Sequence, residues 1–230
     1  MAIIKPNNNT LSAITSLDAT KLTGNLPAIS GASLTGVDGN WVRLAANVLT
    51  SDASSMATDS VFTTTYTHYK LIGNFHVQTN SAEINFLYRV GGSDKTASYY
   101  YCLRLFDDDG GNHEVYDRNS ANARVWNDVY DAGSDDLTGG VGIDMSIFNV
   151  TKKDTLNGSD VTPSTNARPH LFFTGTGYNA ANSKYTAGYG MIRLNESLAH
   201  GSNVDGVKFL TSTGNFQTGS YYMIYGLEDS

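Results

Sequence analysis

The chain has 230 residues, of which 40% are hydrophobic and only 16% are charged, and its formal net charge is −7. This length and hydrophobic content allow one large domain or two small ones with a real core. The charged fraction is below the roughly 25% of ordinary soluble domains, and Gly, Thr, Asn and Ser, which favour turns and strands over helices, make up the difference. The acidic balance excludes nucleic acid as an expected partner, because phosphate binding requires a basic stripe.

Two copies of one short pattern lie near the beginning of the chain. Leu17-Asp-Ala-Thr-Lys-Leu-Thr-Gly24 is followed, twelve residues later, by Ile29-Ser-Gly-Ala-Ser-Leu-Thr-Gly36. A repeat of this size cannot bury its apolar side by itself, and two copies carry too few aliphatic residues for a core of their own. We therefore expect the aliphatic side chains to meet their equivalents in other copies of the chain, at an oligomer interface formed by Leu17, Leu22, Leu26, Ile29 and Leu34.

The run from Ala19 to Gly36 resembles the Leu-Thr-Gly repeats of bacteriophage tail-fibre and virion-appendage proteins. This resemblance implies a homotrimeric fibre or decoration protein of the virion with a β-structured head. It also implies that the N-terminal arm contacts other virion proteins. The position on the virion, whether tail fibre or head decoration, stays open.

The composition changes abruptly at residue 40. Every Trp, Tyr and Phe lies at or beyond Trp41, and the first 40 residues carry four charged side chains, those of Lys5, Asp18, Lys21 and Asp38. We therefore divide the chain into an N-terminal anchoring arm or stalk, residues 1–40, and a head, residues 41–230. The arm holds the two repeats and is expected to be extended.

Beyond residue 41 the hydrophobic residues recur with a period of two, which is typical of strands. Turn-rich segments separate about nine predicted strands, and no stretch shows the pattern of an amphipathic helix. We predict an all-β head, an antiparallel β-sandwich of the jelly-roll or concanavalin-like kind, with the strand connectivity left open. The predicted strands are Phe62–Thr67, Leu71–Val77, Ile84–Val90, Tyr99–Phe106, Val141–Ile147, His170–Thr176, Tyr185–Leu194, Val207–Thr211 and Tyr221–Leu227. The run Tyr99–Phe106 is apolar on both faces apart from Arg104, which favours a central strand.

The sequence offers little catalytic chemistry, so we expect no catalytic residue, no cofactor and no enzyme activity. None of the five histidines lies close enough to another to form a metal motif. The glycine-rich runs 139–142 and 175–177 lack the strand-to-helix setting of a phosphate loop and are interpreted as turns or bulges. Glycoside hydrolysis uses two carboxylates, and because the aspartates cluster in loops, a glycan depolymerase stays open as an alternative.

An acidic run is the best metal candidate. Asp107, Asp108 and Asp109 precede two glycines and could supply oxygen ligands to calcium. The spacing does not match an EF-hand, and a solvated turn without metal is the favoured interpretation. The single cysteine, Cys102, excludes an intrachain disulfide and is expected to be a buried, inert thiol.

Tyrosine is the commonest aromatic residue, with 14 copies. It suits recognition of a host surface glycan or a protein, because its ring stacks while its hydroxyl forms hydrogen bonds. It suits a sandwich core and a trimer interface equally well, and that is the favoured interpretation.

The segment Met1–Pro6 lacks the apolar core of a secretory signal peptide, and no apolar run approaches the ~20 residues that span a bilayer. We therefore expect a protein made in the host cytoplasm, not inserted in a membrane, and located in the virion. The expected function is attachment or particle decoration through surface binding, without catalysis. The alternatives are a capsid decoration protein that stabilises the particle and, less favoured, the glycan depolymerase.

Overall fold

The computed structural model describes residues 41–96, 99–107, 112–129, 140–148, 150, 169–179, 184–194 and 204–228. Within these ranges all regular secondary structure is β, in thirteen strands. No helix in the described ranges is long and apolar enough to cross a membrane. The strands are β1 (Trp41–Val48), β2 (Ser55–Thr58), β3 (Tyr66–His76), β4 (Ala82–Val90), β5 (Ser93–Asp94), β6 (Tyr99–Asp107), β7 (Asn112–Ser120), β8 (Ala123–Val129), β9 (Gly140–Phe148), β10 (His170–Asn179), β11 (Lys184–Leu194), β12 (Gly206–Thr211) and β13 (Tyr221–Glu228).

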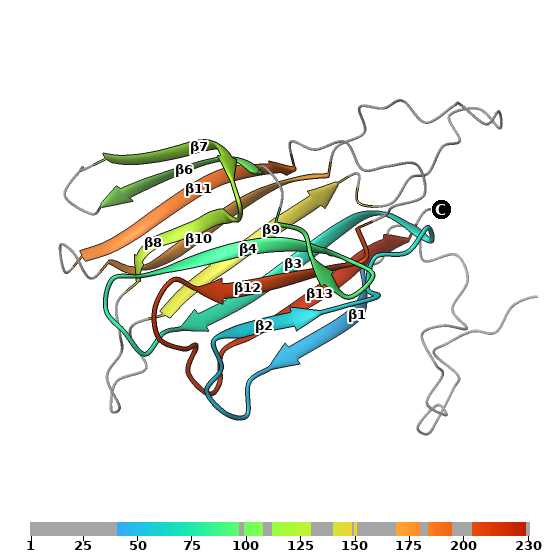
Figure 1. Ribbon diagram of the computed structural model, residues 1–230, viewed down its shortest axis with the longest axis horizontal. Coiled ribbons are helices and arrows are strands. Elements are labelled where there is room, and N and C mark those ends of the chain that lie inside the picture. The colour runs from blue at the N-terminus through green and yellow to red at the C-terminus, as the bar shows by residue number, and fades with distance from the viewer. Residues whose placement is uncertain are drawn as a thin grey trace, which may run out of the picture. The chain divides into compact units, whose positions relative to one another are not determined.

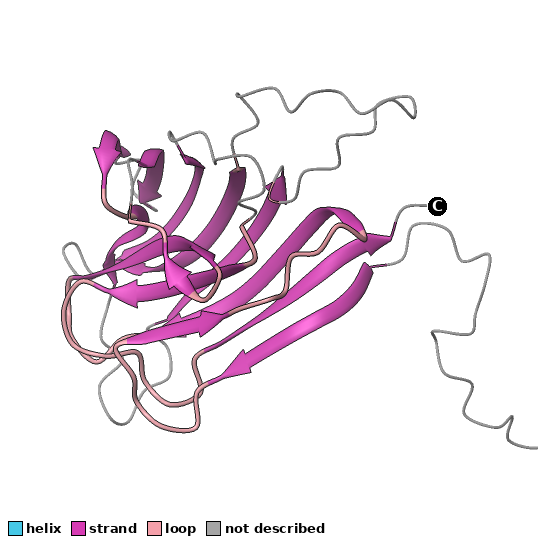
Figure 2. Ribbon diagram, turned by 45° about the vertical axis from the view of Figure 1, so that its right-hand side comes forward, coloured by secondary structure: helices cyan, strands magenta, loops and turns pink. Residues whose placement is uncertain are grey.

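The strands form two antiparallel layers (Figure 1). The large sheet has the order β1-β13-β3-β9-β10-β11-β6-β7. The small sheet has the order β2-β12-β4-β8, and the short β5 pairs with β4. One pairing, Asn179 of β10 with Val129 of β8, links the two sheets. Turning the molecule shows the strongly twisted strands of both layers (Figure 2). The predicted all-β antiparallel sandwich is confirmed.

The core lies between the layers and follows from the alternation of side chains along each strand. On β9 the four residues that point inward, Val141, Ile143, Met145 and Ile147, are buried, and their neighbours in the chain are half-buried. The small sheet contributes Phe86 and Phe209, and the Phe209 ring lies 4.6 Å from that of Phe75 on β3. Contacts of this kind add about 0.5–1.5 kcal/mol per aromatic pair beyond the area that they bury.

Two inward-facing glycines make room for the largest core side chain. Trp126 of β8 is fully buried. A Cβ atom added to Gly175 of β10 would lie 2.9 Å from its ring, and one added to Gly188 of β11 would lie 3.2 Å from it. The glycine run 175–177 pairs on both sides without a register shift, so it belongs to a regular strand and the prediction of a turn or bulge there is wrong. The prediction is also wrong for Gly140 and Gly142, which lie in β9.

Eight of the predicted strands are present, and three differences have physical reasons. The predicted strand Phe62–Thr67 is not a separate strand, because Val61 and Phe62 enter the core from a loop and β3 begins at Tyr66. The prediction of a central strand at Tyr99–Phe106 is wrong, because β6 is the last but one strand of its sheet. Five strands, β1, β2, β5, β7 and β8, were not predicted, and β7 has almost no buried side chain that would produce an alternation.

Candidate binding face on the large sheet

The large sheet has an outer face, which we define as the side chains of its strands that point away from the small sheet. The register places these side chains in rows across the strands. One row contains Ile72 of β3, Asp144 of β9 and Thr174 of β10, and the next contains Asn74, Gly142 and Thr176. Residues that are about 70 or about 30 positions apart in the chain thus become immediate neighbours.

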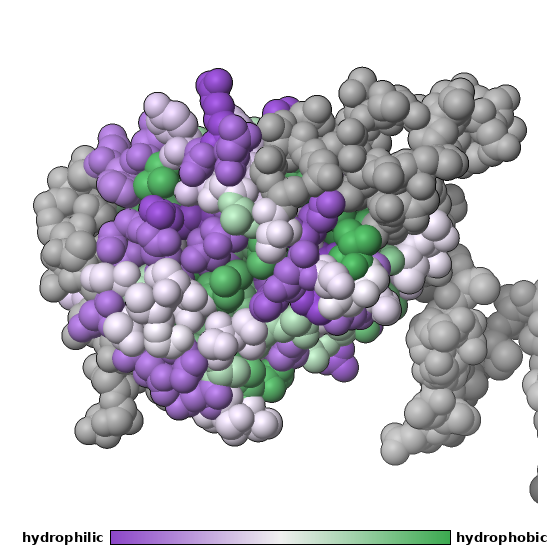
Figure 3. Space-filling model, in the orientation of Figure 1, coloured by the Kyte–Doolittle hydropathy of each residue, from purple (hydrophilic) through white to green (hydrophobic). Residues whose placement is uncertain are grey.

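Exposed hydrophobic side chains are concentrated on this sheet. Of the described residues, nine large hydrophobic side chains are exposed, and all nine belong to strands of the large sheet. They are Trp41, Val42, Val48, Ile72, Phe106, Tyr116, Phe172, Tyr185 and Tyr189. The register places eight of them on the outer face, and Val42, which pairs with the inward-facing Gly226, is the exception. By contrast, the face drawn in Figure 3 is mostly polar or neutral, and its hydrophobic residues form separate small areas. Hydrophobic side chains gathered on one surface mark an interaction site, whereas scattered ones do not.

Several aromatic rings of the outer face lie against one another. The Phe106 and Tyr189 rings are stacked with their centroids 5.7 Å apart, and the Phe148 and His170 rings are stacked at 5.4 Å. The exposed Phe172 ring packs edge-on against Phe148 at 6.4 Å. Rings that are packed in pairs lose less conformational freedom when a ligand covers them, so this arrangement suits recognition.

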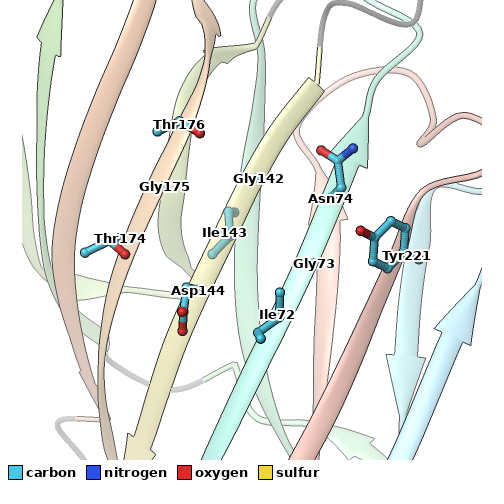
Figure 4. Close-up of a pocket in the computed structure, with 10 residues that line it drawn as sticks. All are labelled: Ile72, Gly73, Asn74, Gly142, Ile143, Asp144, Thr174, Gly175, Thr176 and Tyr221. Atoms are coloured by element: carbon cyan, nitrogen blue, oxygen red, sulfur yellow. The ribbon is translucent and has the colours of Figure 1, made fainter.

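A hollow interrupts the outer face between β13, β3, β9 and β10 (Figure 4). Its volume is about 450 Å³, and it opens to solvent. Gly142 provides part of the floor because it has no side chain. The polar side chains that line it are those of Asn74, Asp144, Thr174, Thr176 and Tyr221.

The charge of Asp144 is compensated on the same face. Lys70 of β3 places its Nζ 2.9 Å from Asp144 Oδ2, and both side chains are partly exposed. An exposed pair of this kind contributes at most about 1 kcal/mol to stability, but it fixes the direction of the carboxylate. Asn74 Nδ2 lies 3.1 Å from His76 Nε2, which fixes the carboxamide beside it.

The structure corrects one prediction about Cys102. The thiol is not buried, because it lies half-exposed on the outer face of β6, opposite Tyr116 of β7. The thiol is 3.9 Å from Glu114 Oε1, to which it donates a hydrogen bond. Partial burial and the Glu114 carboxylate raise the pKa of the thiol, so it stays protonated at neutral pH.

Two sets of predicted site residues lie outside the described residues. They are the oligomer-interface residues Leu17, Leu22, Leu26, Ile29 and Leu34, and most of the calcium candidate, since Asp107 ends β6 while Asp108 and Asp109 follow it. Both predictions remain open. Within the described ranges, no group of three or more His, Cys, Asp or Glu side chains could hold a metal ion.

The chain matches no family model, no curated protein and no solved structure. The functional interpretation therefore depends on the repeats and on the geometry of the large sheet.

Proposed function

We propose that this chain is a structural protein of a phage virion, a fibre or appendage subunit whose β-sandwich head attaches to a surface without catalysis. The observation that carries the proposal is the confinement of the nine exposed large hydrophobic side chains to one sheet. None of these side chains belongs to the buried core. Exposing them to water is unfavourable unless a partner covers them. The Leu-Thr-Gly repeats supply the virion context.

The edges of the large sheet support a multichain assembly, for which we propose a homotrimer. An unpaired edge strand is a template for pairing with another chain, and charged side chains normally prevent this. The outer edge strand β7 carries Glu114, Asp117 and Arg118. The other edge strand, β1, follows the arm in sequence, exposes Trp41 and Val42, and has one charged residue among its eight. The β1 edge is thus the side that suits a neighbouring copy.

The hollow favours binding over hydrolysis. Glycosidases use a pair of carboxyl groups that flank the bond to be cleaved. Among the described residues that line the hollow, Asp144 is the single acidic one, and it is paired with Lys70. This argues for a binding head instead of the glycan depolymerase.

The test is to locate the protein on the virion. Antibodies against the purified full-length chain should label virions of the phage that encodes it in immunogold electron microscopy. The purified chain, added in excess, should also compete with virions for adsorption to host cells. Label at the tail with competition supports attachment, and label over the capsid without competition supports the decoration alternative. Virions that carry no label would refute the proposal.

A further inference from the structure

Gly142 occupies a position where nothing in the sandwich requires glycine. It lies on the outer face in the interior of β9, and its φ is not positive. A Cβ atom added there would meet its nearest neighbour, Thr176 Oγ1, at 3.8 Å, which is ordinary contact. Two nearby glycines differ, because an added Cβ would lie 2.7 Å from the His76 ring at Gly140 and 2.9 Å from Trp126 at Gly175. Gly142 is therefore not explained by packing.

Glycine weakens a strand, because it has no side chain to pack and loses more backbone entropy on folding than other residues. In a strand interior it commonly marks a place where a ligand or another backbone comes close. In this chain the absent side chain leaves open the hollow that Asn74, Asp144 and Thr176 surround. A residue that costs strand stability and opens a polar hollow points to a ligand.

The hollow is lined by groups that match hydroxyl groups. The hydroxyls of Thr174, Thr176 and Tyr221 can each donate and accept a hydrogen bond, the Asp144 carboxylate accepts, and the Asn74 carboxamide does both. The described residues that line the hollow include no lysine or arginine, and the nearby Lys70 ammonium is already paired with Asp144, so an anionic ligand would have to compete with that carboxylate for its cation. A ligand with many hydroxyl groups and no negative charge fits this arrangement best.

We propose that the hollow around Gly142 binds a neutral carbohydrate, with one sugar ring lying over the Gly142 backbone. The hollow reaches from β13 to β10, which at the usual strand separation is about 14 Å, so an oligosaccharide can extend beyond that ring. Ile72 and the Tyr221 ring provide apolar contacts for the C–H groups of the sugar. This inference names the ligand class for the attachment function and rests on that proposed function.

The test uses saturation-transfer NMR and calorimetry on the full chain. The probes are glucose, galactose, mannose and N-acetylglucosamine, with glucuronic acid as the anionic comparison. At least one neutral sugar should bind in the millimolar range. Gly142→Thr should weaken that binding about tenfold or more, because its side chain fills the floor of the hollow. Ser146→Thr is the matched control, since it adds a methyl group on the same face of β9 outside the hollow and should bind like the unaltered chain.

Circular dichroism and the midpoint of thermal unfolding check that the variants fold. Should Gly142→Thr fail to fold, Gly142→Ala replaces it, because its Cβ has room. The inference is overturned if no neutral sugar binds, if glucuronic acid binds more tightly, or if a folded Gly142 variant binds normally. Adsorption measured in parallel separates the two proposals. A chain that competes with virions but binds none of the sugars refutes the carbohydrate site and leaves the attachment function standing.

Discussion

Replacing Tyr88 by Phe should leave the head as stable as before or more stable, whereas the same replacement at Tyr99 should destabilise it. Both phenol rings are buried, and they are stacked with their centroids 6.3 Å apart. The Tyr99 hydroxyl accepts a hydrogen bond from the Tyr88 backbone N–H at 2.9 Å and donates one to the Lys95 carbonyl oxygen at 2.8 Å. The buried Tyr88 hydroxyl has no hydrogen-bond partner among the described residues. The two sites thus differ in bonding and not in burial.

The expected magnitudes follow from that difference. Removing an unsatisfied buried hydroxyl relieves a desolvation cost of about 1–3 kcal/mol, so Tyr88→Phe should gain up to that amount in free energy of unfolding. Tyr99→Phe loses two hydrogen bonds and leaves the Tyr88 N–H unpaired, which should cost about 1–3 kcal/mol. For a domain of this size, each kcal/mol corresponds to a shift of about 2–4 °C in Tm.

The pH dependence provides a second measurement of the same pair. Burial raises the pKa of both phenols above their unfolded value of about 10. Between pH 10 and the raised folded-state pKa, the unfolded chain loses protons that the folded chain keeps. Stability is therefore fully present below about pH 10 and is lost as the pH rises above it, by about 1.4 kcal/mol per pH unit for each such tyrosine. Tyr88→Phe should reduce this slope by one such contribution.

Urea unfolding followed by far-ultraviolet circular dichroism, at pH 7 and at several values between pH 9 and 11, measures both effects. The unaltered chain and Tyr101→Phe serve as controls, since Tyr101 is a buried phenol on the same strand as Tyr99. If Tyr88→Phe lost more than 1 kcal/mol, or if Tyr99→Phe were as stable as the unaltered chain, the assignment of hydrogen bonds in this part of the core would be wrong.

Three further predictions concern the arm and the thiol. A chain of residues 41–230 should keep β-type circular dichroism and unfold cooperatively, and an unfolded or aggregated product would show that the arm completes the sandwich. The full chain should be a trimer by light scattering. The double variant Leu22→Asp, Leu34→Asp should lose assembly, because a buried leucine contributes about 2–5 kcal/mol and an unpaired buried charge adds a penalty. Normal assembly of that variant would mean that the repeats are a passive linker. Cys102 should react with iodoacetamide more slowly than a free cysteine at pH 7. In Glu114→Gln it should react faster than in the unaltered chain, since losing the carboxylate lowers the pKa of the thiol. An unchanged rate in Glu114→Gln would contradict the effect of this carboxylate on the thiol pKa.

The strands that alternation predicted are those with one fully buried face. β9 is the clearest case, since Val141, Ile143, Met145 and Ile147 all point into the core. β7 could not be found in this way, because as an edge strand it buries almost nothing and its residues follow no period. The place of β6 in the order of its sheet could not be predicted either. Hydrophobic residues on both faces of β6 indicate a central strand, although its outer face is partly exposed.

The hollow could not be predicted from the sequence. Asn74, Asp144 and Thr176 come from three strands and meet only through the register of β3, β9 and β10. The one local signal was Gly142, within a glycine-rich run that indicates a turn as readily as a strand. A test for glycine at an outward position of an otherwise regular strand would have singled it out, but that test needs the strand and its facing to be known first.

The chain order within the large sheet has a consequence for synthesis. β13, the described strand nearest the C-terminus, lies between β1 and β3, and Trp41 pairs with Leu227, so β1 has no sheet partner until the last strand has been made. Pairings between such distant residues form late and slowly. A chain terminated early, even by the length of β13 alone, would leave β1 unpaired and one edge of β3 open, and open strand edges promote aggregation. The ribosome must therefore translate through Glu228 before the larger layer can close, which makes synthesis of β13 a condition for a correctly folded head.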